Sequence, residues 1–267
     1  MPTVKVNDIN MYYETHGEGD PLLLIMGFGT DLTGWMFQTP EFSKEYRVIA
    51  FDNRGAGRTD APDKPYSIRM MADDAIGLVD ALRVDRAHVL GLSMGGFIAQ
   101  ELAINHPKRV KSLVLATTEA AFDYAFATQV TGSWVAAKAE GVSPKTYFSL
   151  VLPFLFTDGF FENSELVQMA LGTMAANPNL APAHGLSRQF AACMEHNARD
   201  RLKQITASTL VLVGREDILL PVKLSEELAA LIPKSRLVVL EGGGHGFNAE
   251  IADKFNQEVM AFLDEHP

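Results

Sequence analysis

Six short apolar runs constrain the fold of this chain more than any other feature of its sequence. The runs are rich in Val, Leu and Ile, and each stops at a glycine or a polar turn. They span residues 21–26, 48–51, 88–90, 112–115, 209–213 and 236–240. Apolar runs of this length, without polar alternation, are typical of strands buried on both faces of a sheet. A sheet covered by helices on both sides is therefore expected.

Helical patterns lie between several of these runs. Residues 72–82 place Ile76, Val79 and Leu82 at helical spacing, and residues 97–104 and 222–231 show the same periodicity. Strands that alternate with helices favour a parallel sheet. Near the start, two short alternating stretches flank Asn7 and Asp8, which predicts an antiparallel hairpin. The sequence thus predicts an α/β fold with a mostly parallel sheet of about eight strands.

The alternation breaks between residues 122 and 201. This segment is rich in Ala, Met and Phe, contains four prolines and shows no convincing strand pattern. The segment is far too long for a loop without structure of its own, so it is expected to fold as a helical cap over the strand ends. The predicted organisation is a core made of residues 1–121 and 202–267, with the cap made of residues 122–201.

The strongest motif is Gly91-Leu92-Ser93-Met94-Gly95, which matches G-x-S-x-G. It lies between a predicted strand and a predicted helix, a context in which the serine hydroxyl stands exposed on a sharp turn. The helix that follows would present its positive end to negative charge formed at the serine. A glycine-rich turn with a capping serine is the alternative, but the strand–turn–helix context favours Ser93 as a nucleophile.

A nucleophilic serine needs a base and a carboxylate that orients the base. His245 follows the last apolar run in a glycine-rich loop, and Asp217 follows the run at 209–213. The chain order Ser, Asp, His favours these two residues. Glu119 is an alternative acid, since it follows the run at 112–115. Of the other six histidines, His184 and His196 are expected at the solvated surface of the cap, with contact to the substrate as the alternative role.

Two backbone amides are expected to form the oxyanion hole. One belongs to Met94, which directly follows the nucleophile, and the other to Phe28, in the loop after the run at 21–26. A plain glycine turn is the alternative interpretation of residues 26–29.

Together, these motifs resemble the α/β-hydrolase superfamily in its compact branch with a helical cap, over nearly the whole chain. That branch includes carboxylesterases, enol-lactone hydrolases, carbon–carbon bond hydrolases, methylesterases and cofactor-free haloperoxidases. The stretch from Asp52 to Arg58 looks like a turn that many members carry, in which Asp52 and Arg54 would be structural. Members often have His-Gly before the oxyanion donor, whereas this chain has Met26-Gly27. Relatives with an aspartate nucleophile, the dehalogenases and epoxide hydrolases, are excluded by Ser93.

The resemblance implies a serine hydrolase that cleaves carboxylic esters through an acyl-enzyme. The cap is crowded with apolar side chains, and Trp134, Phe154 and Phe156 are expected to line a pocket for small to medium apolar esters or lactones. The same residues also fit an enol-lactone, thioester or carbon–carbon bond hydrolase, a haloperoxidase-like perhydrolase, or a non-catalytic ligand-binding receptor.

Composition narrows the possible partners. The formal net charge is −10, which disfavours binding to nucleic acid. No apolar run is long enough for membrane insertion, and the N-terminus shows no signal peptide, so a cytoplasmic protein is expected. Cys193 is the single cysteine and is interpreted as a small apolar residue in a helix rather than a nucleophile, because no local catalytic signature surrounds it. The spacing of histidines, cysteines and glycines predicts neither a metal nor a nucleotide cofactor, and the oligomeric state stays open.

Overall fold

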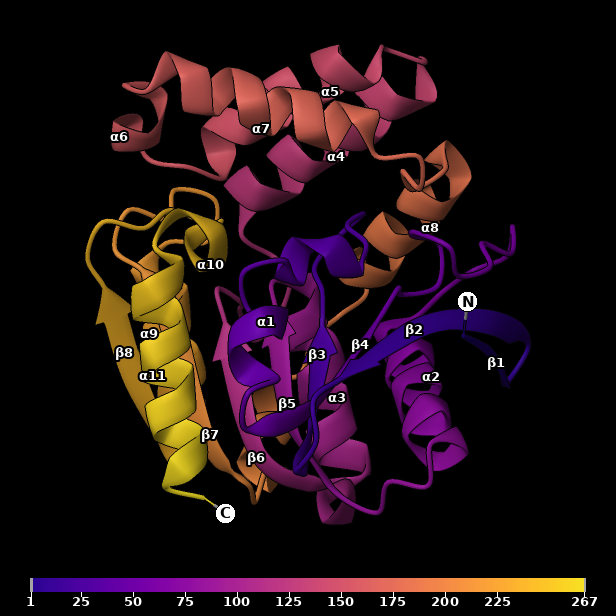
Figure 1. Ribbon diagram of the computed structural model, residues 1–267, viewed down its shortest axis with the longest axis vertical. Helices are drawn as coiled ribbons and strands as arrows, with labels where there is room; N and C mark the ends of the chain where they lie inside the picture. The colour runs from indigo at the N-terminus through magenta and orange to yellow at the C-terminus, as the bar shows by residue number, and fades with distance from the viewer. Residues whose placement is uncertain (1, 267) are drawn as a thin grey trace.

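A computed structural model describes residues 2–266 and contains one eight-stranded sheet (Figure 1). The strand order is β1-β2-β4-β3-β5-β6-β7-β8. The strands are β1 (Thr3–Val6), β2 (Ile9–His16), β3 (Asp20–Ile25), β4 (Tyr46–Phe51), β5 (Ala87–Leu92), β6 (Val110–Ala116), β7 (Ser208–Gly214) and β8 (Ser235–Leu240). Strand β2 pairs antiparallel with β1 and β4, and all other pairs are parallel. The predicted α/β fold is confirmed.

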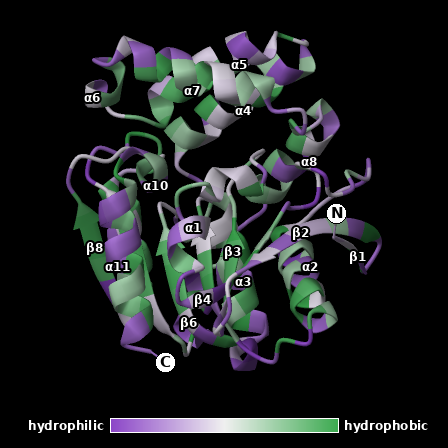
Figure 2. Cartoon of the chain, in the orientation of Figure 1, coloured by the Kyte–Doolittle hydropathy of each residue, from purple (hydrophilic) through white to green (hydrophobic). Residues whose placement is uncertain are grey.

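Both faces of the central strands are buried, which explains why their sequences lack alternation. In β3, Leu23 and Ile25 belong to one apolar cluster, while Leu22 and Leu24 belong to another on the opposite face. Figure 2 shows these strands as predominantly hydrophobic, whereas α11 carries hydrophilic residues on its outer side.

Helices cover each face. The first cluster packs under α2 (Ile68–Ala81), α3 (Met94–Asn105) and α9 (Val222–Leu231), and the second under α1 (Thr39–Phe42) and α11 (Ala252–Asp264). The short helix α10 (Phe247–Glu250) precedes α11.

The parallel register aligns the strand ends at one edge. Ile25 pairs with Gly91, Gly91 with Leu115, Leu115 with Val211, and Val211 with Leu237. These five residues form one row across the sheet. The loops that follow β3, β5, β6, β7 and β8 therefore emerge side by side, which is the usual place for a binding site in such sheets.

The chain leaves the sheet after β6 and returns at β7 through a series of helices. These are α4 (Ala125–Ala139), α5 (Pro144–Val151), α6 (Asp158–Phe161), α7 (Ser164–Ala176) and α8 (Ala183–Met194), called the cap below. Figure 1 shows the cap above the edge where the parallel strands end. Within residues 2–266, no helix is long and apolar enough to cross a membrane.

Candidate active site

The turn between β5 and α3 holds Ser93 in a strained backbone conformation. Ser93 has φ 56° and ψ −121°, outside the regions that non-glycine residues favour. Glycines flank it because the backbone is crowded: a Cβ at Gly95 would overlap the Ile25 carbonyl, and one at Gly91 would overlap the Gly95 carbonyl. The local sequence therefore forces the serine out of the sheet at the aligned edge.

The hydroxyl of Ser93 is the first of three groups in series. His245 Nε2 lies 3.0 Å from Ser93 Oγ, and His245 Nδ1 lies 2.9 Å from Asp217 Oδ2. His245 comes from the loop after β8 and Asp217 from the loop after β7. Both are buried, whereas Ser93 is half-buried. A hydroxyl, an imidazole and a carboxylate in this order can pass the hydroxyl proton to the imidazole.

Hydrogen bonds fix the carboxylate of Asp217. Its Oδ1 accepts from the backbone amides of Leu219 (2.9 Å) and Leu220 (2.8 Å). Its Oδ2 accepts from the hydroxyl of Thr117 in addition to its contact with His245. Charge-assisted bonds of this kind stabilise the ionised carboxylate in one orientation. The sequence motifs did not point to Thr117, whose position directly after β6 is its only signal in the sequence.

Two glutamates hold the loop that carries His245. Glu216 accepts hydrogen bonds from the amides of Gly242 and Gly243 at 3.1 and 3.0 Å, so its carboxylate points away from the histidine ring. On the other side, Glu250 Oε2 accepts from the Gly244 amide at 2.9 Å. The histidine loop is thus attached to the β7 loop and to α10.

The cap contacts the histidine loop directly. The Gly246 amide donates to the Leu155 carbonyl at 2.6 Å. Glu250 Oε1 accepts from both the amide and the hydroxyl of Thr157, at 2.9 and 2.5 Å. Glu250 therefore connects residue 157, between α5 and α6, to the loop of His245.

The loop after β3 passes beside the serine. A Cβ at Gly27 would lie 3.2 Å from Ser93 Cβ. Among residues 2–266, neither the Phe28 nor the Met94 amide donates a hydrogen bond. Free amides beside a nucleophile can receive an oxyanion. From α8, Gln189 Oε1 accepts from the next amide, Gly29, at 2.9 Å and so supports the loop.

The three aromatic residues expected to line a pocket fall into two groups. Trp134 in α4 is buried, with its ring centroid 5.9 Å from that of Phe154. Phe156 stacks on Phe160 at 4.2 Å, and its ring lies 3.1 Å from where a Cβ on Gly246 would be. Phe156 is thus beside the histidine loop, while Trp134 and Phe154 pack together within the cap.

Glu119, the alternative acid, makes no hydrogen bond through its carboxyl group within the described residues. Burial raises the pKa of this carboxyl to about 8. The structure joins His245 to Asp217 instead.

The expectation for His196 was wrong. This residue is buried rather than solvated, and its ring stacks on Phe97 with centroids 4.7 Å apart. Burial lowers the pKa of His196 to about 4. The burial of His196 could not be predicted from the sequence, because the residue lies after α8, where the chain turns back to the sheet and no helical periodicity applies. His184 is exposed, as expected, and Cys193 is buried, with its thiol pKa raised by burial.

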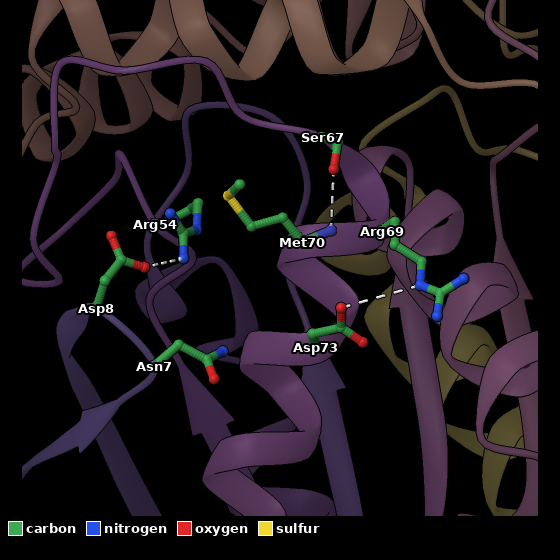
Figure 3. Close-up of a pocket in the computed structure, with 7 residues that line it drawn as sticks. All are labelled: Asn7, Asp8, Arg54, Ser67, Arg69, Met70 and Asp73. Carbon is green, nitrogen blue, oxygen red and sulfur yellow. Dashed lines mark hydrogen bonds and ion pairs between the residues drawn. The ribbon is translucent and has the colours of Figure 1, made fainter.

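Asp52 and Arg54 make contacts that fix loops. Asp52 accepts from the amides of Leu32 and Arg58, both at 2.8 Å. Arg54 forms ion pairs with Asp74 and Asp8. Arg54 lies at a hollow of about 350 Å³. Figure 3 shows the residues that line it: Asn7, Asp8, Arg54, Ser67, Arg69, Met70 and Asp73. None of these residues belongs to the Ser93 site.

Comparison with known proteins agrees with this geometry. A family model described as alpha/beta hydrolase fold matches residues 20–250. The chain belongs to the α/β-hydrolase family. It is 33% identical to 3-oxoadipate enol-lactonase 2 of Acinetobacter baylyi, over 98% of this chain and 96% of the relative. It is 31% identical to a protein of Azorhizobium caulinodans named as a carbamate hydrolase, RutD, over 99% of both chains.

Solved structures of the family show the same architecture. A thermophilic esterase from Thermogutta terrifontis superposes with a TM-score of 0.88, at 29% identity over the full length of both chains.

Within residues 2–266 of the present α/β hydrolase, no group of three or more His, Cys, Asp or Glu side chains is arranged to hold a metal ion.

Proposed function

We propose that this α/β hydrolase cleaves carboxylic esters of small to medium apolar substrates through an acyl-enzyme on Ser93. The family and the names of its relatives make the chain a hydrolase. The observation that carries the proposal is the series from Ser93 Oγ through His245 to Asp217, with hydrogen-bond distances of 3.0 and 2.9 Å.

In the proposed first step, Ser93 Oγ attacks the substrate carbonyl carbon while its proton moves to His245 Nε2. The carbonyl oxygen becomes an oxyanion, which accepts hydrogen bonds from the amides of Phe28 and Met94. Asp217 stays ionised and stabilises the imidazolium through Nδ1.

The tetrahedral intermediate then collapses. His245 returns its proton from Nε2 to the leaving alcohol, and the acyl group stays on Ser93. Water repeats the sequence in the second half-reaction: His245 removes its proton, the acid is released, and the serine hydroxyl is restored.

We further propose that residues 122–201 act as a cap domain that closes over this site. Trp134, Phe154 and Phe156 would provide an apolar wall, and Met26 in place of a histidine leaves the floor without a polar side chain. Such a pocket favours neutral acyl groups. Each CH₂ that is buried should contribute about 0.8 kcal/mol, or about fourfold in kcat/KM, until the pocket is full.

Enol-lactones and carbamates are the principal alternative substrates, since relatives are named as an enol-lactonase and a carbamate hydrolase. The proposed mechanism serves an enol-lactone or a carbamate equally well, because each presents a carbonyl carbon to the serine. The substrate panel must therefore include both.

The test is a series of p-nitrophenyl esters from acetate to palmitate below their micellar limit, with an enol-lactone and a carbamate in parallel. Activity should climb with acyl length and then fall, and Ser93→Ala should lose on the order of 10⁶ in kcat. Substantial ester hydrolysis by folded Ser93→Ala would overturn the assignment of the nucleophile. Best activity on palmitate, on a dicarboxylate-type lactone or on the carbamate would overturn the proposed substrate class.

A further inference from the structure

Thr117 occupies a strained position at the carboxyl end of β6. Its φ is 44°, in the left-handed region that β-branched residues rarely adopt. The side chain is completely buried, and the amide donates to the Leu212 carbonyl at 2.7 Å, which fastens the residue to β7. Strain of this kind persists only where the surrounding contacts enforce it, and it is concentrated at functional sites.

The side chain of Thr117 faces the acid and the base together. Its hydroxyl donates to Asp217 Oδ2, the same oxygen that lies 2.9 Å from His245 Nδ1. The hydroxyl oxygen is also 3.2 Å from His245 Nδ1. Because its proton is directed to the carboxylate, the hydroxyl presents its lone pairs to the imidazole. Both neighbours of Nδ1 are then acceptors, which favours the tautomer with hydrogen on Nδ1 and a free lone pair on Nε2.

The residues on either side of Thr117 hold the backbone of the nucleophile. The Ser93 amide donates to the Ala116 carbonyl at 2.9 Å, and the Thr118 hydroxyl donates to the Ser93 carbonyl at 2.9 Å. A single tripeptide thus contacts Ser93 through its outer members and the Asp217–His245 pair through its central one. A shift of this segment would therefore move Ser93, Asp217 and His245 relative to one another.

We propose that Thr117 is a positioning residue for the reaction, whose hydroxyl aligns Asp217 and fixes the tautomer of His245. This inference rests on the proposed function. Thr117 does not contact the substrate and gains or loses no proton in the cycle. Its contribution is to keep Nε2 unprotonated and directed at Ser93 Oγ before the substrate arrives.

The test compares Thr117→Val, which removes the hydroxyl but keeps the β-branched shape, with Thr117→Ser, which keeps the hydroxyl. Loss of a hydrogen bond to a charged group should lower kcat about 10- to 100-fold in Thr117→Val and leave KM within about twofold. Thr117→Ser should stay within about threefold of the parent. The acid limb of the pH–rate profile of Thr117→Val should move to higher pH, because a carboxylate with one donor fewer favours the imidazolium more strongly.

A double-mutant cycle separates positioning from a structural role. With Asp217→Asn as background, Thr117→Val should lower kcat by less than about threefold, because the Asp217 carboxylate through which Thr117 acts is already gone. An equal loss in both backgrounds, or an activity of Thr117→Val within about twofold of the parent, would overturn the inference. If Thr117→Val does not fold, Thr117→Ala is measured in its place, with thermal unfolding as the check. Failure of the proposed function is distinguished by Ser93→Ala, which would then retain activity whatever the result at Thr117.

Discussion

At the scale of single residues, two buried carboxyl groups near the strand ends have opposite environments. Asp217 accepts hydrogen bonds from the Leu219 and Leu220 amides and lies against His245. Glu119 is buried without a hydrogen-bond partner for its carboxyl among the described residues, and its pKa is raised to about 8 by that burial. Only the first environment stabilises a negative charge beside an imidazolium. Chain order favoured Asp217, but the hydrogen-bond partners that separate the two carboxyl groups are not visible in the sequence.

The contrast predicts unequal effects of neutral replacements. Asp217→Asn should lower kcat on the order of 10⁴-fold, as in serine proteases, because the imidazole loses its orienting acceptor. Glu119→Gln should leave kcat within about twofold and serves as the matched control for removing a buried carboxyl. Steady-state kinetics on one ester suffice, and a severe loss in Glu119→Gln with a benign Asp217→Asn would reverse the assignment.

At the scale of elements, the sequence predicted the strands and several helices more closely than their contacts. The runs at 209–213 and 236–240 fall inside β7 and β8. Strand β7 is buried on both faces, and such strands have unbroken apolar sequences, whereas the edge strand β8 is only partly buried. Helix α11 was missed, although Phe255, Val259 and Phe262 show helical spacing. The contact of Glu250 with the cap could not be predicted, because it joins residues 93 positions apart through half-buried polar groups that carry no periodic signal.

The contact between the cap and α10 predicts an effect on activity rather than on stability. Glu250 accepts from Thr157 and Gly244 through separate oxygens, and Glu250→Gln would turn an N–H group toward one of these donors. We expect kcat/KM to fall about 10-fold as the loop of His245 loosens, with little change in the unfolding temperature. Glu195→Gln, at an exposed glutamate of the cap side, is the control, and equal activity in the two variants would contradict the role of Glu250.

At the scale of the whole molecule, three buried groups with large pKa shifts contribute to the dependence of stability on pH near neutrality. Burial lowers the pKa of His88 and of His196 to about 4 and raises that of Glu119 to about 8. The unfolded chain binds more protons than the native one at the histidines below their ordinary pKa of about 6.5, so they lose stability as pH falls through that range. Glu119 acts in the other direction: the native state retains a proton that the unfolded state releases above about pH 4.5, so stability falls as pH rises toward 8.

These opposing effects predict maximal stability near about pH 6.5. Below this pH, the stability lost at the two histidines as pH falls exceeds the stability gained at Glu119. Above it, Glu119 alone changes the stability, which falls as pH rises. The unfolding temperature should drop by on the order of 5 °C between about pH 6 and about pH 9. Glu119→Gln should flatten that alkaline side and steepen the acid side, because Glu119 then no longer opposes the two histidines below about pH 6.5. Calorimetry across this range provides the check, and an equal alkaline slope in Glu119→Gln would exclude Glu119 as its cause.

The order in which the active site forms during folding follows from one row of paired residues across the sheet. The row runs from Ile25 through Gly91, Leu115 and Val211 to Leu237. Its members are scattered over most of the chain, and the base lies in a loop beyond the last strand. Pairings between such distant segments form slowly, since long stretches of chain must close first. A nascent chain still lacking β8 would carry the serine turn but no base. In refolding, recovery of turnover should thus report the docking of the final strand, later than any signal from the helices around Ser93.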